Sequence, residues 1–128
     1  MLRTGRLSSQ TLNLLNILES KLPDFYLAGG TALAMYCEHR VSYDLDFFTA
    51  ESFRPEVMLG YLKRLGVSVE NVRIQTGILE TEIEGVRASF FEYHYALVGP
   101  FNKYRSLNVA SIIDLAAMKL SAIAARAE

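Results

Sequence analysis

The chain has few of the residues that mark a cross-linked or metal-stapled protein. Among its 128 residues there are one cysteine, Cys37, three prolines and no tryptophan. A single cysteine excludes a disulfide within the chain and a zinc site built from several cysteines, and this usage is typical of a reducing, cytosolic compartment. We interpret Cys37 as a small, buried apolar residue rather than as a catalytic thiol.

The chain also lacks an excess of charge and a long hydrophobic run. Its 13 basic and 14 acidic residues give a net charge of −1, which excludes a protein held to nucleic acid by its overall charge. No segment approaches the roughly 20 apolar residues of a membrane span, and the amino terminus lacks the apolar core of a secretory signal. With 51% hydrophobic and 21% charged residues, we expect one folded domain, in the cytoplasm and without membrane contact.

The pattern of apolar and turn residues predicts a single α/β (α+β) domain over residues 1–128, with a mixed β-sheet flanked by helices. A first helix, capped by Ser8 or Ser9, is predicted until Pro23 interrupts it. A short strand over 25–28, a glycine turn and a helix over 31–40 follow. The other expected elements are helices over 55–65 and 111–128 and strands over 43–48, 67–72, 77–83 and 86–95, the last two joined by a tight turn at 84–85.

The segment Gly29-Gly30-Thr31 has the composition of a phosphate-binding turn. Two glycines at the end of a buried strand let the backbone approach a phosphate, and the helix that follows directs free N–H groups at the same point. The Thr31 hydroxyl adds one more donor. Taken alone, this pattern is more often an ordinary turn.

Asp44 and Asp46 form the second candidate feature. Two residues apart on a strand, they leave the same face with Cα atoms about 7 Å apart, which suits carboxylates that share a divalent metal. A solvated edge strand is the alternative. Two carboxylates among Tyr43, Leu45 and Phe47 carry a large burial cost unless a cation offsets it. Together with the glycine turn, the pair therefore indicates metal-dependent nucleotidyl transfer.

The stretches Phe25-Tyr-Leu-Ala-Gly-Gly-Thr-Ala-Leu-Ala34 and His39-Arg-Val-Ser-Tyr-Asp-Leu-Asp-Phe-Phe48 resemble the signature of the AbiEii/AbiGii-type nucleotidyltransferases. These are toxins of bacterial toxin–antitoxin and phage-abortive systems within the DNA polymerase β-like superfamily. The resemblance implies Gly29, Gly30 and Thr31 as the nucleotide-phosphate turn and Asp44 and Asp46 as metal ligands. It also implies a nucleoside triphosphate as substrate and Mg²⁺, or Mn²⁺ in its place, as cofactor. Arg40 and Ser42 resemble family positions that order the loop.

The third carboxylate that superfamily members usually supply from a later strand is ambiguous. By resemblance its place is nearer Ser89 than Glu92, and the two side chains leave opposite faces of one strand. Either Glu92 is the third carboxylate, or the site works with two and another group accepts the proton. Glu80, Glu82 and Glu84 alternate along another strand, a pattern typical of a solvated face.

The last predicted helix carries a candidate lysine. Ser111-Ile-Ile-Asp114 has the spacing of a capping box, so we interpret Asp114 as a helix-start carboxylate. Lys119 falls inside the apolar arc of this helix, where an ammonium group needs an anionic partner or a route to the rim. The Asp-Leu-Ala-Ala-Met-Lys stretch resembles a family motif whose lysine contacts the nucleotide phosphates, which implies a catalytic and nucleotide-binding role for Lys119.

The sequence thus predicts an Mg²⁺-dependent enzyme that moves a nucleoside monophosphate from a triphosphate to a macromolecular acceptor. By resemblance the acceptor is tRNA or a protein, and the enzyme is a toxin with a cognate antitoxin. The alternatives are a catalytically impaired nucleotide- or partner-binding module and a nucleotidyltransferase for small molecules. Relatives continue into further helices, so we expect a catalytic core without their carboxy-terminal part. We expect self-association or another chain to cover the apolar arc around Lys119.

Overall fold

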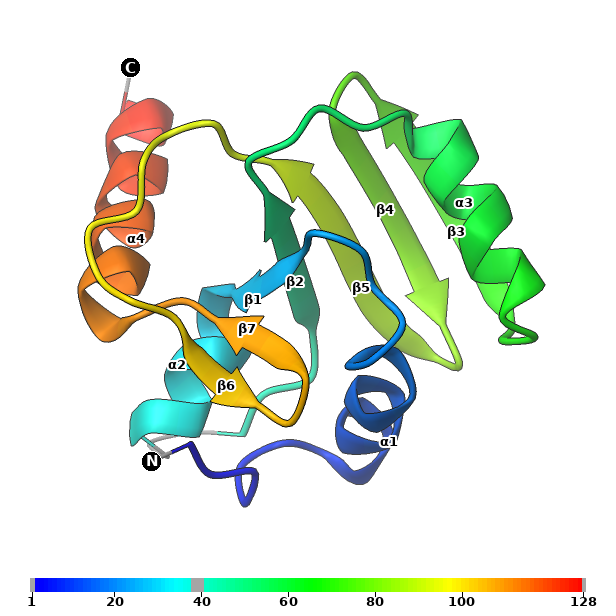
Figure 1. The fold of residues 1–128 in the computed structure, drawn as a ribbon, viewed down its shortest axis with the longest axis horizontal. Helices are drawn as coiled ribbons and strands as arrows, with labels where there is room; N and C mark the ends of the chain where they lie inside the picture. The colour runs from blue at the N-terminus through cyan, green and yellow to red at the C-terminus, as the bar shows by residue number, and fades with distance from the viewer. Residues whose placement is uncertain (1, 38–40, 128) are drawn as a thin grey trace.

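The computed structural model describes residues 2–37 and 41–127, with the side chains of these residues up to Ala125. Within them, seven strands form one mixed sheet in the order β3-β4-β5-β2-β1-β7-β6 (Figure 1). Strand β1 is antiparallel to β2 and parallel to β7, and β2 is parallel to β5. The elements are α1 (Ser9–Leu18), β1 (Tyr26–Ala28), α2 (Gly29–Cys37), β2 (Leu45–Thr49), α3 (Pro55–Arg64), β3 (Val69–Gln75), β4 (Ile78–Ile83), β5 (Val86–Glu92), β6 (Asn102–Tyr104), β7 (Leu107–Val109) and α4 (Ile112–Ala127). The expected mixed α/β fold is confirmed.

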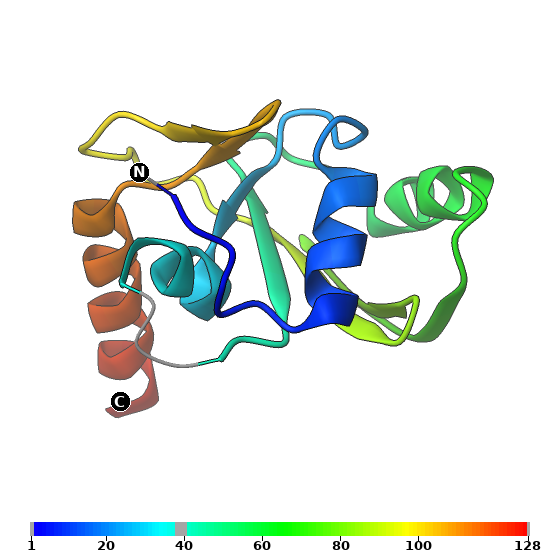
Figure 2. The same ribbon diagram turned by 90° about the horizontal axis from the view of Figure 1, so that it is seen from below.

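Helices lie on both sides of the sheet (Figure 2). Helices α1 and α3 lie on one side, where α1 packs on β5 and α3 packs on β3 and β4. Helices α2 and α4 pack against each other on the opposite side, with α2 on β1 and β2. Side chains that face α1 and α3 form much of the core, and they include Leu27, Leu45, Phe47, Leu79 and Phe90. The opposite face carries Asp46, and over β4 and β5 it stays accessible.

Most of the predicted elements are present with shifted ends. The tight turn at Glu84 and Gly85 is confirmed, because both residues have a positive φ, of 50° and 79°, as a two-residue hairpin turn requires. Helix α1 has Ser8 as its cap but ends at Leu18, before Pro23. Strands β6 and β7 were not predicted, because three-residue strands are too short to show an alternating pattern.

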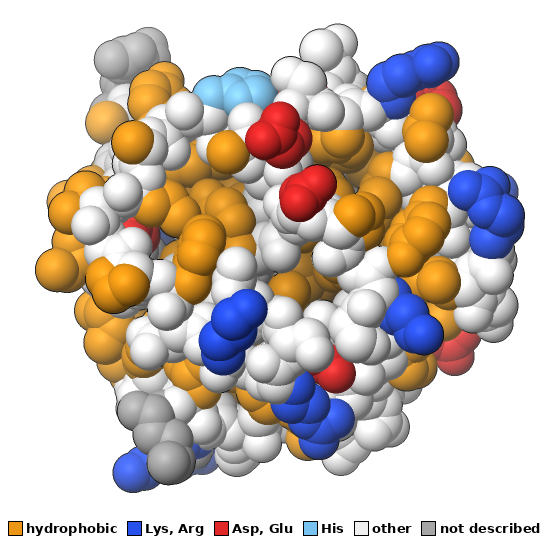
Figure 3. Space-filling view, viewed as in Figure 1, with side chains coloured by type: hydrophobic (Ala, Val, Ile, Leu, Met, Phe, Trp, Pro, Cys, Tyr) orange, Lys and Arg blue, Asp and Glu red, His pale blue; other side chains and the backbone are white. Residues whose placement is uncertain are grey.

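One burial prediction is wrong. Cys37 is exposed rather than buried, because it is the last residue of α2 and lies beyond the helical turn that packs on the sheet. The apolar arc of α4 is buried only at Leu115, whereas Ile123 is 51% exposed and Lys119 and Leu120 are also exposed. Hydrophobic side chains therefore gather at the surface over α4, at the left of Figure 3.

Candidate active site

The glycine turn lies directly against one of the two aspartates. Ala28 at the end of β1 pairs in register with Asp46 on β2. Gly29 follows with a φ of +72°, and a Cβ atom added there would lie 2.4 Å from the Asp46 Oδ2 atom. Only glycine combines this backbone conformation with so close an approach. A glycine is therefore needed at position 29 to leave room for the Asp46 carboxylate, and the sequence alone did not show this contact.

Asp46 is the electrostatically strained member of the pair. Burial, the neighbouring charge of Asp44 and, more weakly, Glu80 raise the pKa of Asp46 from 3.8 to about 6, while the positive charge of Arg87 acts in the opposite direction. The charged form of a carboxylate in this position is costly because it has lost water and faces another negative charge. A cation at the pair would offset both effects.

The loop that carries Asp44 is held by Thr31 from α2. The Thr31 hydroxyl, with a side chain that is only 2% exposed, donates to the backbone carbonyl of Asp44 and lies 2.5 Å from the Ser42 hydroxyl. Because this hydroxyl is engaged with the loop, it orients Asp44 rather than pointing freely at a ligand. Ser42 contributes to the order of this loop, as the resemblance implied, whereas Arg40 lies outside the described residues.

The start of α1 holds the same loop from the other side. The Thr11 hydroxyl donates to the Tyr43 carbonyl at 2.7 Å, and it accepts a 2.7 Å hydrogen bond from Ser8. The Ser42 amide donates to the Arg6 carbonyl at 2.8 Å. Sequence reasoning took Ser8 only as a helix cap and missed Thr11, since nothing in the sequence places α1 beside residues 42–44. Both anchors hold the backbone next to Asp44.

Two adjoining hollows meet at the aspartates. The smaller, of about 270 Å³, is lined by Gly30, Thr31, Asp44 and Asp46 among others. The larger, of about 470 Å³, is lined by Gly29, Gly30, Asp46, Phe48 and one face of α4 that includes Lys119. Gly30 and Asp46 belong to both. The structure therefore brings together six of the seven predicted site residues.

Glu92 is the predicted residue that the structure does not bring to the pair. In the parallel pairing of β2 with β5, Ser89 lies opposite Asp46, and Glu92 lies opposite Thr49. The Glu92 carboxylate accepts the Phe53 amide at 3.1 Å and contacts the His94 ring at 2.9 Å. These two hydrogen bonds lower the pKa of Glu92, the amide having the larger effect. Ser89, which is 4% exposed, occupies the place beside Asp46.

The base of α4 is fixed by Asp114. Its amide donates to the Ser111 hydroxyl at 3.2 Å, and its carboxylate accepts this hydroxyl and the amides of Val98 and Gly99. The Asp114 amide bond to Ser111 is one half of the predicted capping box, whereas the Asp114 carboxylate accepts the Ser111 hydroxyl in place of its backbone amide. Burial acts to raise the pKa of Asp114, but the Val98, Ser111 and Gly99 hydrogen bonds outweigh it and leave the pKa below its usual value. Asp114 thus anchors both α4 and the loop before β6.

The donor set at the aspartates suits a divalent metal with few protein ligands. Two carboxylates that are two residues apart, with space beside them, match the needs of Mg²⁺, which binds one or two carboxylates and completes its shell with water and phosphate. Among the residues that the structure describes, no group of three metal-ligating side chains comes together. The residues present therefore fit a metal that shares its coordination with a phosphate substrate.

A mixed α/β sheet with a glycine turn, paired carboxylates and a facing lysine defines a protein of the nucleotidyltransferase class. The profile of a family described as "Nucleotidyl transferase AbiEii toxin, Type IV TA system" matches residues 14–104. The chain belongs to this AbiEii family. The match includes the glycine turn and both aspartates, and it ends before Lys119.

Relatives in sequence and structure are longer than this chain. An uncharacterized protein of Aquifex aeolicus, aq_aa25, is 38% identical in an alignment of 110 positions that covers 80% of this chain and 52% of that protein. JHP933 from Helicobacter pylori has a TM-score of 0.61 at 21% identity, over 89% of this chain and 57% of that one. A "putative nucleotidyltransferase" from H. pylori has a TM-score of 0.60 at 20% identity, over 88% and 59%. At these identities the two structures show the fold, and the chain spans little more than half of each relative's length.

None of the described helices is both long enough and apolar enough to cross a bilayer.

Proposed function

We propose that this chain is the catalytic core of an Mg²⁺-dependent nucleotidyltransferase that moves a nucleoside monophosphate from a triphosphate to tRNA or a protein and releases pyrophosphate. One observation carries the proposal: Asp46 is shared by the hollow that contains Asp44 and the hollow that contains Lys119. Phosphates in the larger hollow would lie between the amino terminus of α2 and the Lys119 ammonium group, next to the metal ligands.

The residues divide the work by their chemistry. Asp44 and Asp46 would hold the metal, with Mn²⁺ able to replace Mg²⁺, and such a metal lowers the pKa of an attacking hydroxyl and neutralises the leaving pyrophosphate. Gly29 and Gly30 let the phosphates approach the backbone. Lys119 supplies positive charge on the far side of the same hollow, where negative charge develops as pyrophosphate departs.

Family membership supports a biological role. Because the family is described as the toxin of a type IV toxin–antitoxin system, we propose that the chain acts as such a toxin in the cytoplasm and that an antitoxin opposes it. The exposed apolar face of α4 supports the further expectation of a covering chain, either a second copy or a partner.

The proposal is tested by incubating the purified chain with α-labelled nucleoside triphosphates, Mg²⁺ and separate RNA, protein and metabolite fractions of a bacterial extract. We expect label in RNA or protein with the wild type and none with Asp46→Asn. The control variant Glu70→Gln removes one exposed carboxylate on β3, away from the site, and should label as the wild type does. Equal labelling by wild type and Asp46→Asn would refute the proposal.

A binding module is the second candidate, favoured by the presence of Ser89 where a third carboxylate is expected. It predicts triphosphate binding with Mg²⁺ in calorimetry, weakened by Lys119→Ala, together with no labelling of any fraction. Labelling of the metabolite fraction alone would instead indicate a small-molecule acceptor.

A further inference from the structure

Glu80 lies on the same face of the sheet as Asp46 and makes no hydrogen bond or ion pair with any residue that the structure describes. We propose that Glu80 is the general base that takes the proton from the acceptor hydroxyl, and that the hollow between Asp44 and Glu80 receives the acceptor. This inference rests on the proposed nucleotidyl transfer, and it answers the question of which group replaces the carboxylate expected near Ser89.

Glu80 is aligned with Asp46 across the sheet. Asp46 on β2 pairs with Ser89 on β5, and Ser89 pairs with Glu80 on β4. Directly paired residues point to the same face, and two strand spacings place the Cα atoms of Asp46 and Glu80 about 10 Å apart. The intervening Ser89 is small and buried, at 4% exposed, so it supplies no carboxylate between Asp46 and Glu80.

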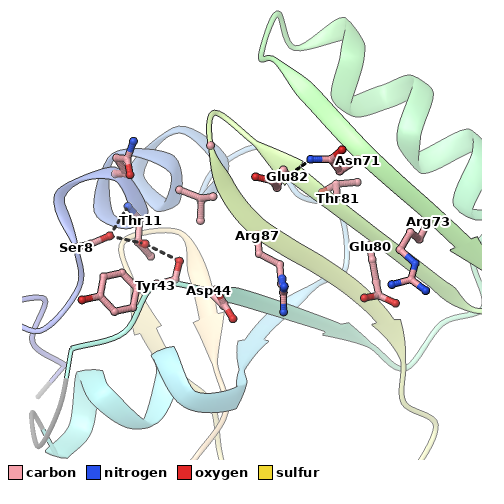
Figure 4. Close-up of a pocket in the computed structure, with 13 residues that line it drawn as sticks. Ser8, Thr11, Tyr43, Asp44, Asn71, Arg73, Glu80, Thr81, Glu82 and Arg87 are labelled. Carbon is pink, nitrogen blue, oxygen red and sulfur yellow. Dashed lines mark hydrogen bonds between the residues drawn. The ribbon is translucent and has the colours of Figure 1, made fainter.

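A hollow connects Glu80 to the metal-binding side. It measures about 590 Å³ and is lined by Tyr43, Asp44, Arg73, Glu80 and Arg87 among others. Tyr43 and Asp44 also line the small hollow at the aspartate pair, so the two spaces adjoin. In Figure 4 the side chains of Asp44, Arg87 and Glu80 extend to the same side of the sheet, with Arg87 between the two carboxylates.

The geometry of phosphoryl transfer selects this hollow for the acceptor. The attacking and leaving oxygens lie roughly in line, on opposite sides of the phosphorus atom. If the pyrophosphate end lies toward Gly29, Gly30 and Lys119, the attacking hydroxyl must approach from the opposite side of the aspartate pair. The hollow that continues from Asp44 toward Glu80 lies on that side.

Other acidic side chains nearby are already engaged. Glu82 accepts a hydrogen bond from the Asn71 amide group, and Glu84 accepts the Ser68 amide at 2.6 Å. Glu92 is held by Phe53 and His94. Among the described residues, the half-buried Glu80 carboxylate makes no hydrogen bond or ion pair. Of these four carboxylates, Glu80 alone makes no hydrogen bond or ion pair within the described part of the chain; it lines the hollow, as Glu82 also does.

Transfer of the nucleoside monophosphate to the acceptor hydroxyl needs no further reactant. A Glu80 oxygen accepts the proton of the acceptor hydroxyl while the hydroxyl oxygen forms a bond to the α-phosphorus. The bond between the α-phosphorus and the bridging oxygen breaks, and pyrophosphate leaves with the electron pair. The proton then passes from Glu80 to water.

The test compares Glu80→Gln with the wild type in the labelled-transfer assay with its best acceptor fraction. Loss of a general base lowers rates by 10²- to 10⁴-fold, so we expect kcat to fall at least about 100-fold. Where kcat of the wild type rises with pH, kcat of Glu80→Gln should not. Binding of triphosphate in calorimetry and of Mn²⁺ in electron paramagnetic resonance should stay within about twofold, whereas Asp46→Asn weakens Mn²⁺ binding. Glu84→Gln changes a carboxylate in the turn between β4 and β5 that does not line the hollow, so this control variant should retain the wild-type kcat.

A second variant tests the replacement directly. The double variant Glu80→Gln/Ser89→Asp should have a kcat at least about tenfold above that of Glu80→Gln, because it has a carboxylate beside Asp46. Circular dichroism checks that the double variant is folded. Wild-type kcat in Glu80→Gln would overturn the inference and leave the proposed function intact. Loss of Mn²⁺ binding in Glu80→Gln would overturn the role as base. A wild type that transfers no label would overturn the inference together with the proposed function.

Discussion

Removing the charge of Asp46 should stabilise the metal-free protein. Its pKa is about 6 in the folded chain against the ordinary 3.8, so the folded state holds the proton more tightly than the unfolded state does. At about 1.4 kcal/mol for each pKa unit, keeping Asp46 ionised costs the folded state about 3 kcal/mol above pH 6. Below pH 3.8 both states are protonated and this cost vanishes. Asp46→Asn removes the cost, so the gain should grow as the pH rises from 3.8 to about 6 and should be complete above that.

Urea unfolding in metal-free buffer measures this effect. At pH 8 we expect the free energy of unfolding of Asp46→Asn to exceed that of the wild type by up to about 3 kcal/mol, which at a typical urea dependence of about 2 kcal/mol per molar raises the midpoint by about 1.5 M. At pH 3.5 the two should coincide. The Glu70→Gln control should change stability by less than about 0.5 kcal/mol at either pH. Mg²⁺ at 100 times its dissociation constant should add about 2.7 kcal/mol to the wild type alone. Equal or lower stability of Asp46→Asn at pH 8 would refute the reasoning.

Three further outcomes are expected. Gly29→Ala should lower stability by about 1–3 kcal/mol and abolish label transfer, because its Cβ would collide with Asp46, whereas Gly66→Ala, which has a φ of +84° and nothing within 4 Å, should lower stability alone; transfer by Gly29→Ala at the wild-type rate would contradict this. Hydrogen bonds to Glu92 and to the Ala50 carbonyl raise the pKa of His94, so its NMR titration should lie above 6.5 and return toward that value in Glu92→Gln. The interaction favours folding while His94 is protonated, and its contribution should disappear as the pH rises through the folded-state pKa. Tyr26→Phe should raise the free energy of unfolding by about 1 kcal/mol, because the buried Tyr26 hydroxyl has no hydrogen-bond partner among the described residues, and a loss of stability in chemical denaturation would argue against this account.

Local sequence patterns predicted the parts of the site that lie close together in the chain. The glycine turn and the Asp44–Asp46 alternation are short-range features, and each requires only the end of one strand or the pleat of another. The parallel pairing of β2 with β5 is different, because it joins segments separated by α3 and by two strands. Only that register places Ser89 beside Asp46 and aligns Glu80 with both.

The position of Lys119 shows a second limit of sequence reasoning. Helical periodicity placed it correctly on one face of α4 with Leu115, but periodicity does not say how much of that face another element covers. Burial stops at Leu115 because α2 covers only the beginning of the helix. The same face therefore serves as core at one end and as an open wall of the larger hollow further along.

The contacts of Asp114 make the active site dependent on a segment that touches no substrate. This carboxylate joins the Val98 and Gly99 amides to the first turn of α4, and Lys119 lies little more than one turn further along the same helix. A change at residues 98–99 can therefore move the lysine relative to Gly29 without altering either residue. If Lys119 binds nucleotide as we propose, substitutions in this loop should change nucleotide affinity although they lie far in sequence from both the glycine turn and the aspartates.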